Sequence, residues 1–195
     1  LNNQALHYAN QGVTINEIHN VYEVPKSLQH QWAARSYHGD VKNNSRAVIN
    51  RFLGFYDNNP VNLHPLSPQD SAPLYVEMMG GSAKIIAKGR QLIDQGKYLD
   101  ASEILNKLQL AETRNMPARR LLADAYEQLG YQAESTSVRN SYLQGAYELR
   151  NGLPSAAAPR TCSVITTGPV VRRPARPSTL KVRRVSMRDC PSRSS

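Results

Sequence analysis

Two stretches in the second half of the chain decide the fold: YLDASEILNKLQLAE at residues 98–112 and PARRLLADAYEQL at residues 117–129. Their patterns predict two helices. Three more helices are predicted over residues 68–79, 82–95 and 132–150. Glycines at 80, 81, 96, 130 and 152 separate or end these stretches, and glycine is common where helices stop. The sequence therefore predicts an all-α fold, a helical bundle over residues 68–152.

The spacing of two glycines suggests how these helices pair. Gly96 and Gly130 are 34 residues apart, and each is followed by a turn and then a helix that carries an early alanine. This is the period of tetratricopeptide hairpins, which need about three repeats to stand alone. Two hairpins leave one end uncovered, so another surface must cover that end, and a second copy of the chain would serve.

Residues 1–67 mix short helical patterns with turns. Helices are predicted over residues 1–10, 15–21 and 27–35, the second with a capping box formed by Thr14 and Glu17. Asn44 or Ser45 is predicted to cap a further helix that ends at Gly54. Prolines at 60, 65 and 68 then prevent regular helix, so this stretch is interpreted as a strap between two bodies. In Gly80-Gly81-Ser82, Ser82 is predicted to cap the next helix.

Positive charge is confined to the C-terminal tail. The chain carries 24 Lys and Arg against 15 Asp and Glu, and residues 154–195 hold nine of the former and one of the latter. The rest is therefore close to neutral, with 15 against 14. Residues 153–195 lack aromatic residues and are predicted to be a disordered basic tail. A shifted reading frame is one hypothesis for the composition of this tail. Both cysteines, Cys162 and Cys190, lie there and are interpreted as free thiols.

Several long segments together resemble the linear alkylsulfatases of the metallo-β-lactamase superfamily. The resemblance covers roughly residues 1–160 and rests on these segments: YHG at 37–39, NSRAV at 44–48, RFLGFYDNNP at 51–60, YVEMMGG at 75–81, LLADAYEQLGYQAES at 121–135 and GAYELRNG at 145–152. Asn43 stands where the family usually has His, Phe52 where it usually has Tyr, and Asn58 where it usually has Gly. The first two changes remove an imidazole and a phenol from that region, and with them polar contacts. Asparagine tolerates the left-handed backbone that glycine adopts.

The resemblance implies a modular parent enzyme that hydrolyses primary alkyl sulfates such as dodecyl sulfate. Its parts would be a two-zinc catalytic domain, a helical domain that makes an interlocked homodimer, and a sterol-carrier-like domain. Residues 1–67 would be the C-terminal edge of the catalytic domain with a linker, and residues 68–152 the dimerisation domain. A start at Leu1 without a following apolar segment suggests a cut edge or a mature end. The resemblance also implies a periplasmic location, for which the exporting signal would lie outside this sequence.

The chain lacks the ligand pattern that the parent chemistry needs. A two-zinc hydrolase needs a dense cluster of histidine and carboxylate ligands, and none of the five histidines forms a His-x-His pair. No metal ligand and no catalytic residue are therefore predicted in this chain. Asn44, Arg46 and Tyr56 are the candidates for alkyl sulfate binding, because amide, guanidinium and phenol groups can donate to sulfate oxygens. An alternative to sulfate binding stays equally open: Asn44 would cap a helix, and Arg46 would be a cation on the helix surface.

Three functional hypotheses follow from the sequence. The first is a homodimerisation module of an alkylsulfatase, with no catalysis of its own. The second is a stand-alone tetratricopeptide-like adaptor, which would be a monomer with an open groove. The third is a nucleic-acid binder acting through the basic tail, which is disfavoured because the body of the chain is nearly neutral. No apolar run approaches the length of a membrane span.

Overall fold

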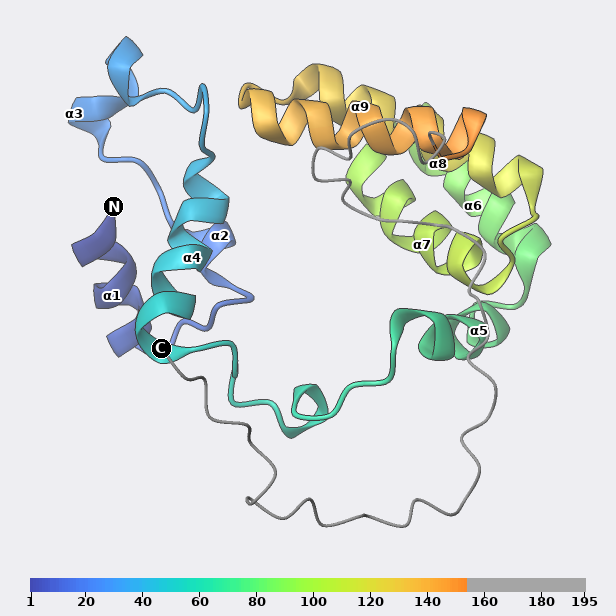
Figure 1. Ribbon diagram of the computed structural model, residues 1–195, viewed down its shortest axis with the longest axis horizontal. Helices are drawn as coiled ribbons and strands as arrows, with labels where there is room; N and C mark the ends of the chain where they lie inside the picture. Colours follow the sequence, from blue (N-terminus) through green and yellow to red (C-terminus); the bar gives the residue numbers. More distant parts are fainter. Residues whose placement is uncertain (154–195) are drawn as a thin grey trace, which may run out of the picture.

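The computed structural model describes residues 1–153, and over this range the chain forms helices and contains no strand. The N-terminal lobe, residues 1–53, precedes a strap over residues 54–67, and a five-helix bundle follows (Figure 1). The lobe contains α1 (Asn2–Asn10), α2 (Ile18–Val21), α3 (Lys26–Gln29), the 3-10 turn η1 (Trp32–Ala34) and α4 (Val41–Leu53); the strap contains η2 (Pro60–Asn62); the bundle contains α5 (Pro68–Met78), α6 (Ser82–Asp94), α7 (Tyr98–Ala111), α8 (Met116–Gln132) and α9 (Thr136–Asn151). The predicted all-α class is confirmed.

The bundle has one apolar core built around α7. This helix packs against α5, α6 and α8, and α8 packs along α9. Leu105, Leu108 and Leu122 are fully buried there, surrounded by small residues such as Ala101 and Ala118 that let the helices approach closely. Removal of these apolar side chains from water is the main favourable term in folding.

The N-terminal lobe has a smaller core of its own. Ile18, Tyr22 and Ile49 are buried together, so α1 and α2 pack on one side of α4. The capping box predicted at Thr14 forms only in part. The Glu17 carboxylate accepts from the backbone N–H of Thr14 at 3.1 Å and from its hydroxyl at 2.8 Å. The helix then begins at Ile18, three residues later than predicted.

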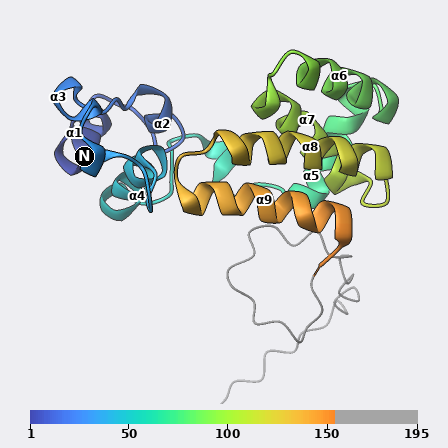
Figure 2. The same cartoon turned by 90° about the horizontal axis from the view of Figure 1, so that it is seen from above.

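The lobe and the bundle meet at the start of α9, opposite the strap. The Tyr37 carbonyl accepts from the backbone N–H and the hydroxyl of Thr136, at 2.9 and 2.8 Å. The His38 carbonyl accepts from the hydroxyl of Ser137, and Arg35 pairs with Glu134 at 2.5 Å. The two bodies are therefore connected at one end by these bonds and at the other by the chain itself (Figures 1 and 2).

Four further local predictions were wrong. The α4 helix is capped by Asp40, whose carboxylate accepts from the Asn43 N–H at 2.9 Å, so neither Asn44 nor Ser45 is the cap. The helix expected over residues 27–35 is divided into α3 and η1. Gly81 takes the cap position of α6, and the Ser82 hydroxyl instead donates to the Glu112 carboxylate.

The fourth wrong prediction concerns Gly130. It does not end its helix, because α8 continues to Gln132. A β carbon at this position would lie 2.9 Å from the side chain of Leu143 in α9. Glycine is therefore needed here for a close approach of two helices. Gly54, Gly96 and Gly152 do follow helices, as predicted, and they have positive φ.

Candidate functional site

An uncovered run of apolar side chains is the first candidate site. Both phenylalanines of the chain are exposed, and the run continues along the strap and into α5. Phe55 is 72% exposed, Val61 71% and Met78 79%. We call the ten large apolar residues of this run the apolar strip: Phe52, Leu53, Phe55, Tyr56, Val61, Leu63, Leu66, Leu74, Tyr75 and Met78. Contiguous exposed apolar surface marks protein or ligand contact sites.

The start of the strap is held in place by one aspartate. The Asp57 carboxylate accepts from the Asn16 amide at 2.6 Å, the Asn62 amide at 2.7 Å and the Asn59 backbone N–H at 3.1 Å. These bonds lower the pKa of Asp57, with the Asn59 N–H as the largest cause. Asn58 has φ of 63°, so the expectation that asparagine would take a left-handed conformation here is confirmed. The strap therefore leaves the lobe in a fixed direction.

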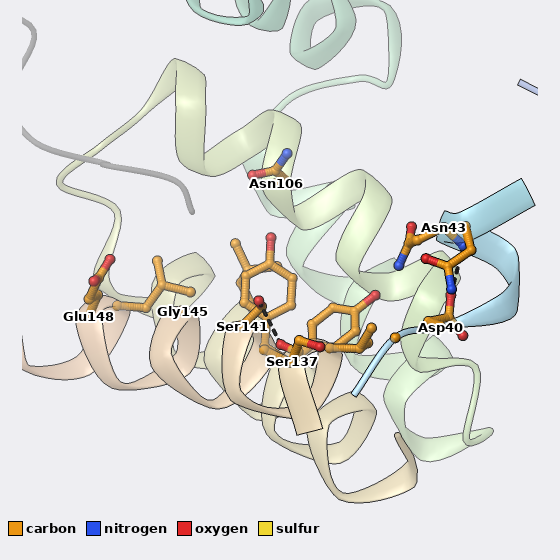
Figure 3. Close-up of a pocket in the computed structure, with 14 residues that line it drawn as sticks. Asp40, Asn43, Asn106, Ser137, Ser141, Gly145 and Glu148 are labelled. Atoms are coloured by element: carbon orange, nitrogen blue, oxygen red, sulfur yellow. Dashed lines mark hydrogen bonds between the residues drawn. The ribbon is translucent and has the colours of Figure 1, made fainter. Parts of the chain in front are cut away.

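A cavity of about 500 Å³ is the second candidate site. It lies between the beginning of α4 and the side of α9 that faces α7 and α8 (Figure 3). Helical spacing places the lining residues of α9 on one face, namely Ser137, Val138, Ser141, Tyr142, Gly145, Glu148 and Leu149. Asp40, Asn43 and Asn44 line it from the lobe, and Asn106, Leu122 and Tyr126 from α7 and α8.

Two tyrosines form the middle of this cavity. The rings of Tyr126 and Tyr142 are 5.8 Å apart between centroids and tilted by 50°. Burial raises the pKa of Tyr126 to about 12, with smaller contributions from Tyr142 and Glu103. Burial also raises the pKa of Tyr142, and the negative charge of Asp40 adds to this effect. Both phenols therefore remain neutral hydrogen-bonding groups at physiological pH.

The structure does not bring the three predicted substrate residues together. Asn44 lines the cavity, whereas Arg46 is exposed two residues later, about 200° around the helix at 3.6 residues per turn. Tyr56 follows the other end of α4, and about 14 Å of helix axis separates Asn44 from Leu53 at that end. Asn43 and Asn44 reach the cavity from the first turns of α4.

The described residues do not fit a two-zinc centre. No three of the His, Cys, Asp and Glu side chains in residues 1–153 come together as a possible metal site. No step through a metal is therefore derived for this chain. Within the same residues, no helix combines the length and the apolar character that a membrane crossing requires.

A family model described as alkyl sulfatase dimerisation matches residues 14–152, which include α2 to α9. The chain belongs to this family. The match spans most of the lobe, the strap and the bundle.

Curated and solved alkylsulfatases are similar to the same part of the chain. An (R)-specific secondary-alkylsulfatase of Pseudomonas sp. is 47% identical over 80% of the chain, and an alkyl/aryl-sulfatase of Saccharomyces cerevisiae is 42% identical over 79%. A solved stereoselective inverting sec-alkylsulfatase from Pseudomonas sp. superposes over 79% of the chain and 24% of its own, with a TM-score of 0.77 and 46% identity. The chain spans about a quarter of the length of the curated relatives it matches.

Sequence reasoning missed the residues that shape the cavity. Glu148 has the ordinary appearance of an exposed helix glutamate, yet it is 3% exposed and lines the cavity. One signal was present in the sequence: Ser137, Ser141 and Gly145 repeat every four residues and end one turn before Glu148. Such a stripe of small residues predicts a close approach or a groove along one helix face.

Proposed function

We propose that this chain is the homodimerisation module of an alkylsulfatase, with the apolar strip as the central part of its contact with a second copy. The observation that carries the proposal is the strip itself, in a chain that belongs to a dimerisation family. Every residue from 58 to 70 is exposed, so nothing in the described residues covers the strap. Large apolar side chains favour burial by about 1.5–3 kcal/mol each.

A second copy suits this surface better than a small ligand does. The strip follows an extended segment and a helix rather than the walls of a cavity. A long apolar surface of this kind is typical of the buried centre of an obligate dimer, which is more apolar than ordinary surface. Charged side chains are scarce within it: Asp57, Asp70 and Glu77 are the only ones between residues 52 and 78.

The activity that we propose for the complete enzyme is hydrolysis of alkyl sulfates. The similar proteins are named as secondary-alkylsulfatase, alkyl/aryl-sulfatase and linear primary-alkylsulfatase. Two zinc ions would act in a part of the parent protein that residues 1–153 do not form. Residues 1–67 would be the edge of the catalytic domain. Because Arg46 and Tyr56 lie apart from Asn44, the three residues would not donate together to one sulfate group.

The dimer is tested by sedimentation velocity across protein concentration. We expect the 195-residue chain to sediment as a dimer, and the double variant Val61→Ser/Met78→Ser to dissociate at concentrations at least about a hundredfold higher. Both side chains are more than 70% exposed in the chain, so the fold of the monomer does not depend on them. Leu99→Ser is the matched control, because Leu99 is 63% exposed on α7 outside the strip.

A monomer at the highest concentration would contradict the proposal and favour the stand-alone tetratricopeptide-like adaptor. Equal dissociation of the Leu99→Ser variant would show that the strip is not the contact. The nucleic-acid hypothesis depends on residues 154–195, which lie outside the described residues, as do the predicted disorder, the two cysteines and the reading-frame hypothesis.

A further inference from the structure

Acidic side chains accompany the apolar strip along its length. Asp57 directly follows Tyr56 in the strap, and Asp70 and Glu77 lie on α5. On that helix Asp70, Leu74 and Glu77 have the i, i+4, i+7 spacing of one helix face, so the exposed leucine lies between two exposed carboxylates. Both the strap part and the helix part of the strip therefore have a carboxylate beside them.

Two of these carboxylates are held in place by hydrogen bonds. The Asn59 backbone N–H and two asparagine side-chain amides donate to the Asp57 carboxylate, and these bonds lower its pKa. The Ser67 hydroxyl donates to Asp70 at 2.6 Å. Hydrogen bonds of this kind favour the charged form of a carboxylate. Negative charge is therefore fixed in position at the strap and at the start of α5.

No free cation balances this charge within the strip. Residues 52–78 contain three acidic residues and neither Lys nor Arg. Lys107 of α7 does reach the strip, where its Nζ lies 4.8 Å from the ring centroid of Tyr75, but it also pairs with Glu103 at 3.9 Å. Arg51 precedes the strip and lies about 200° around α4 from Leu53. An anion at the strip would therefore meet mainly like charge.

We infer that these carboxylates protect the strip from anionic amphiphiles, so that the contact between two copies withstands the alkyl sulfates on which the complete enzyme acts. This inference rests on the proposed function, which supplies both the second copy and the anionic substrate. The chain of an alkyl sulfate could cover exposed apolar side chains in place of the second copy. Its head group, however, has the same charge as the three carboxylates, which disfavours binding.

A second copy differs from an alkyl sulfate in its ratio of apolar surface to charge. It brings ten large apolar side chains against three acidic ones, whereas each alkyl sulfate brings one charge with a single chain. Apolar burial grows with the area removed from water. The same carboxylates therefore oppose the small amphiphile more than they oppose the dimer.

The test is sedimentation velocity of the 195-residue chain with octyl sulfate or octyltrimethylammonium, each below its micelle concentration. The measured quantity is the dimer Kd with the amphiphile divided by the Kd without it. At about 10 mM salt and about pH 8, where histidine side chains are ordinarily neutral, we expect this ratio to be about threefold to tenfold smaller for octyl sulfate. The difference should shrink at about 1 M salt, where the Debye length is about 3 Å.

A charge reversal beside the strip tests the cause. Glu77→Lys should raise the octyl sulfate ratio by about twofold to tenfold, and Glu77→Gln should raise it less. Asp94→Lys on α6 is the matched control, because Asp94 is likewise exposed in the last turn of its helix and the net charge changes equally. All variants keep the basic residues 154–195, so octyl sulfate bound there cancels in the comparison. Circular dichroism reports whether each variant is folded.

The possible failures are distinguishable. A chain that is monomeric without any amphiphile would overturn both the proposed function and this inference. A dimer that both amphiphiles dissociate equally would overturn the inference alone. So would equal octyl sulfate ratios for Glu77→Lys and Asp94→Lys, because the charge beside the strip would then have no effect of its own.

Discussion

The substitution Gly89→Ala should destabilise the bundle, even though alanine is the better helix former. Gly89 lies inside α6 and faces Leu105 of α7. A β carbon at residue 89 would lie 2.8 Å from Cδ2, 2.9 Å from Cγ and 3.1 Å from Cδ1 of that leucine. Leu105 is fully buried in the core, so its side chain cannot move aside without displacing other core residues.

Two opposing effects determine how much Gly89→Ala changes the free energy of unfolding. Replacing glycine by alanine in a helix interior contributes about 1 kcal/mol of stability. Forcing an extra carbon into a packed core typically costs about 1–3 kcal/mol. Because three atoms of Leu105 are too close at once, the cost lies in the upper half of this range. The net loss should be about 1–2 kcal/mol, which lowers the melting temperature by roughly 2–8 °C for a chain of this size.

The assay is urea denaturation followed by circular dichroism, at one fixed protein concentration because dimerisation would shift the apparent stability. Gly145→Ala is the matched control, since the nearest atom to its β carbon is a ring carbon of Tyr126 at the ordinary contact distance of 3.4 Å. That variant should be unchanged or up to about 1 kcal/mol more stable. Equal stability of the two variants would refute the packing argument.

Two further predictions concern the cavity and the contact beside it. The raised pKa of Tyr126, about 12 against an ordinary 10.0, means that its neutral form stabilises the fold below pH 10 and that this stability is lost as the pH rises from 10 toward 12. Titration of tyrosinate absorbance should show a late-ionising component that is smaller by one tyrosine in Tyr126→Phe; an unchanged titration would contradict this. Thr136→Val removes the hydroxyl that donates to the Tyr37 carbonyl and keeps the backbone bond, so it should cost about 0.5–1.5 kcal/mol. Hydrogen exchange should become faster around residues 35–38, and faster exchange throughout the bundle instead would show that the contact is not local.

The bundle helices were predictable because their signals are local. Leucine and alanine continue through each helix, and glycines with positive φ follow α5, α6 and α9. Gly130 shows the limit of this reasoning. Its role is set by Leu143, which lies 13 residues away and on another helix. A glycine that ends a helix and a glycine that admits a neighbouring helix look the same in one sequence.

Of the cavity between α4 and α9, the sequence predicted only the edge formed by Asn44. Asn44 was singled out and does line the cavity, but its roles in capping and in substrate binding could not be separated from sequence. The cap of α4 turned out to be Asp40, so Asn44 is not needed for that role. Glu148 was missed because it lies about a hundred residues along the chain from Asp40 and Asn44, which line the same cavity. Contacts of that separation have no local signature.

The strap gives a physical reason why dimerisation and the shape of this chain should depend on each other. Residues 54–67 can span at most about 50 Å. Beyond Asp57 their backbone–backbone hydrogen bonds are limited to the short turn at Pro60–Asn62 and to the Ser67 carbonyl, which accepts from Asp70 and Ser71 at the start of α5. An extended segment loses conformational entropy when it is ordered, and this one recovers little from contacts within its own chain. Its exposed Phe55, Val61 and Leu66 would recover that loss only when another surface removes them from water. Contact with a second copy would therefore order the strap and bury the strip in the same event, in addition to the bonds at the start of α9 that already connect the lobe and the bundle.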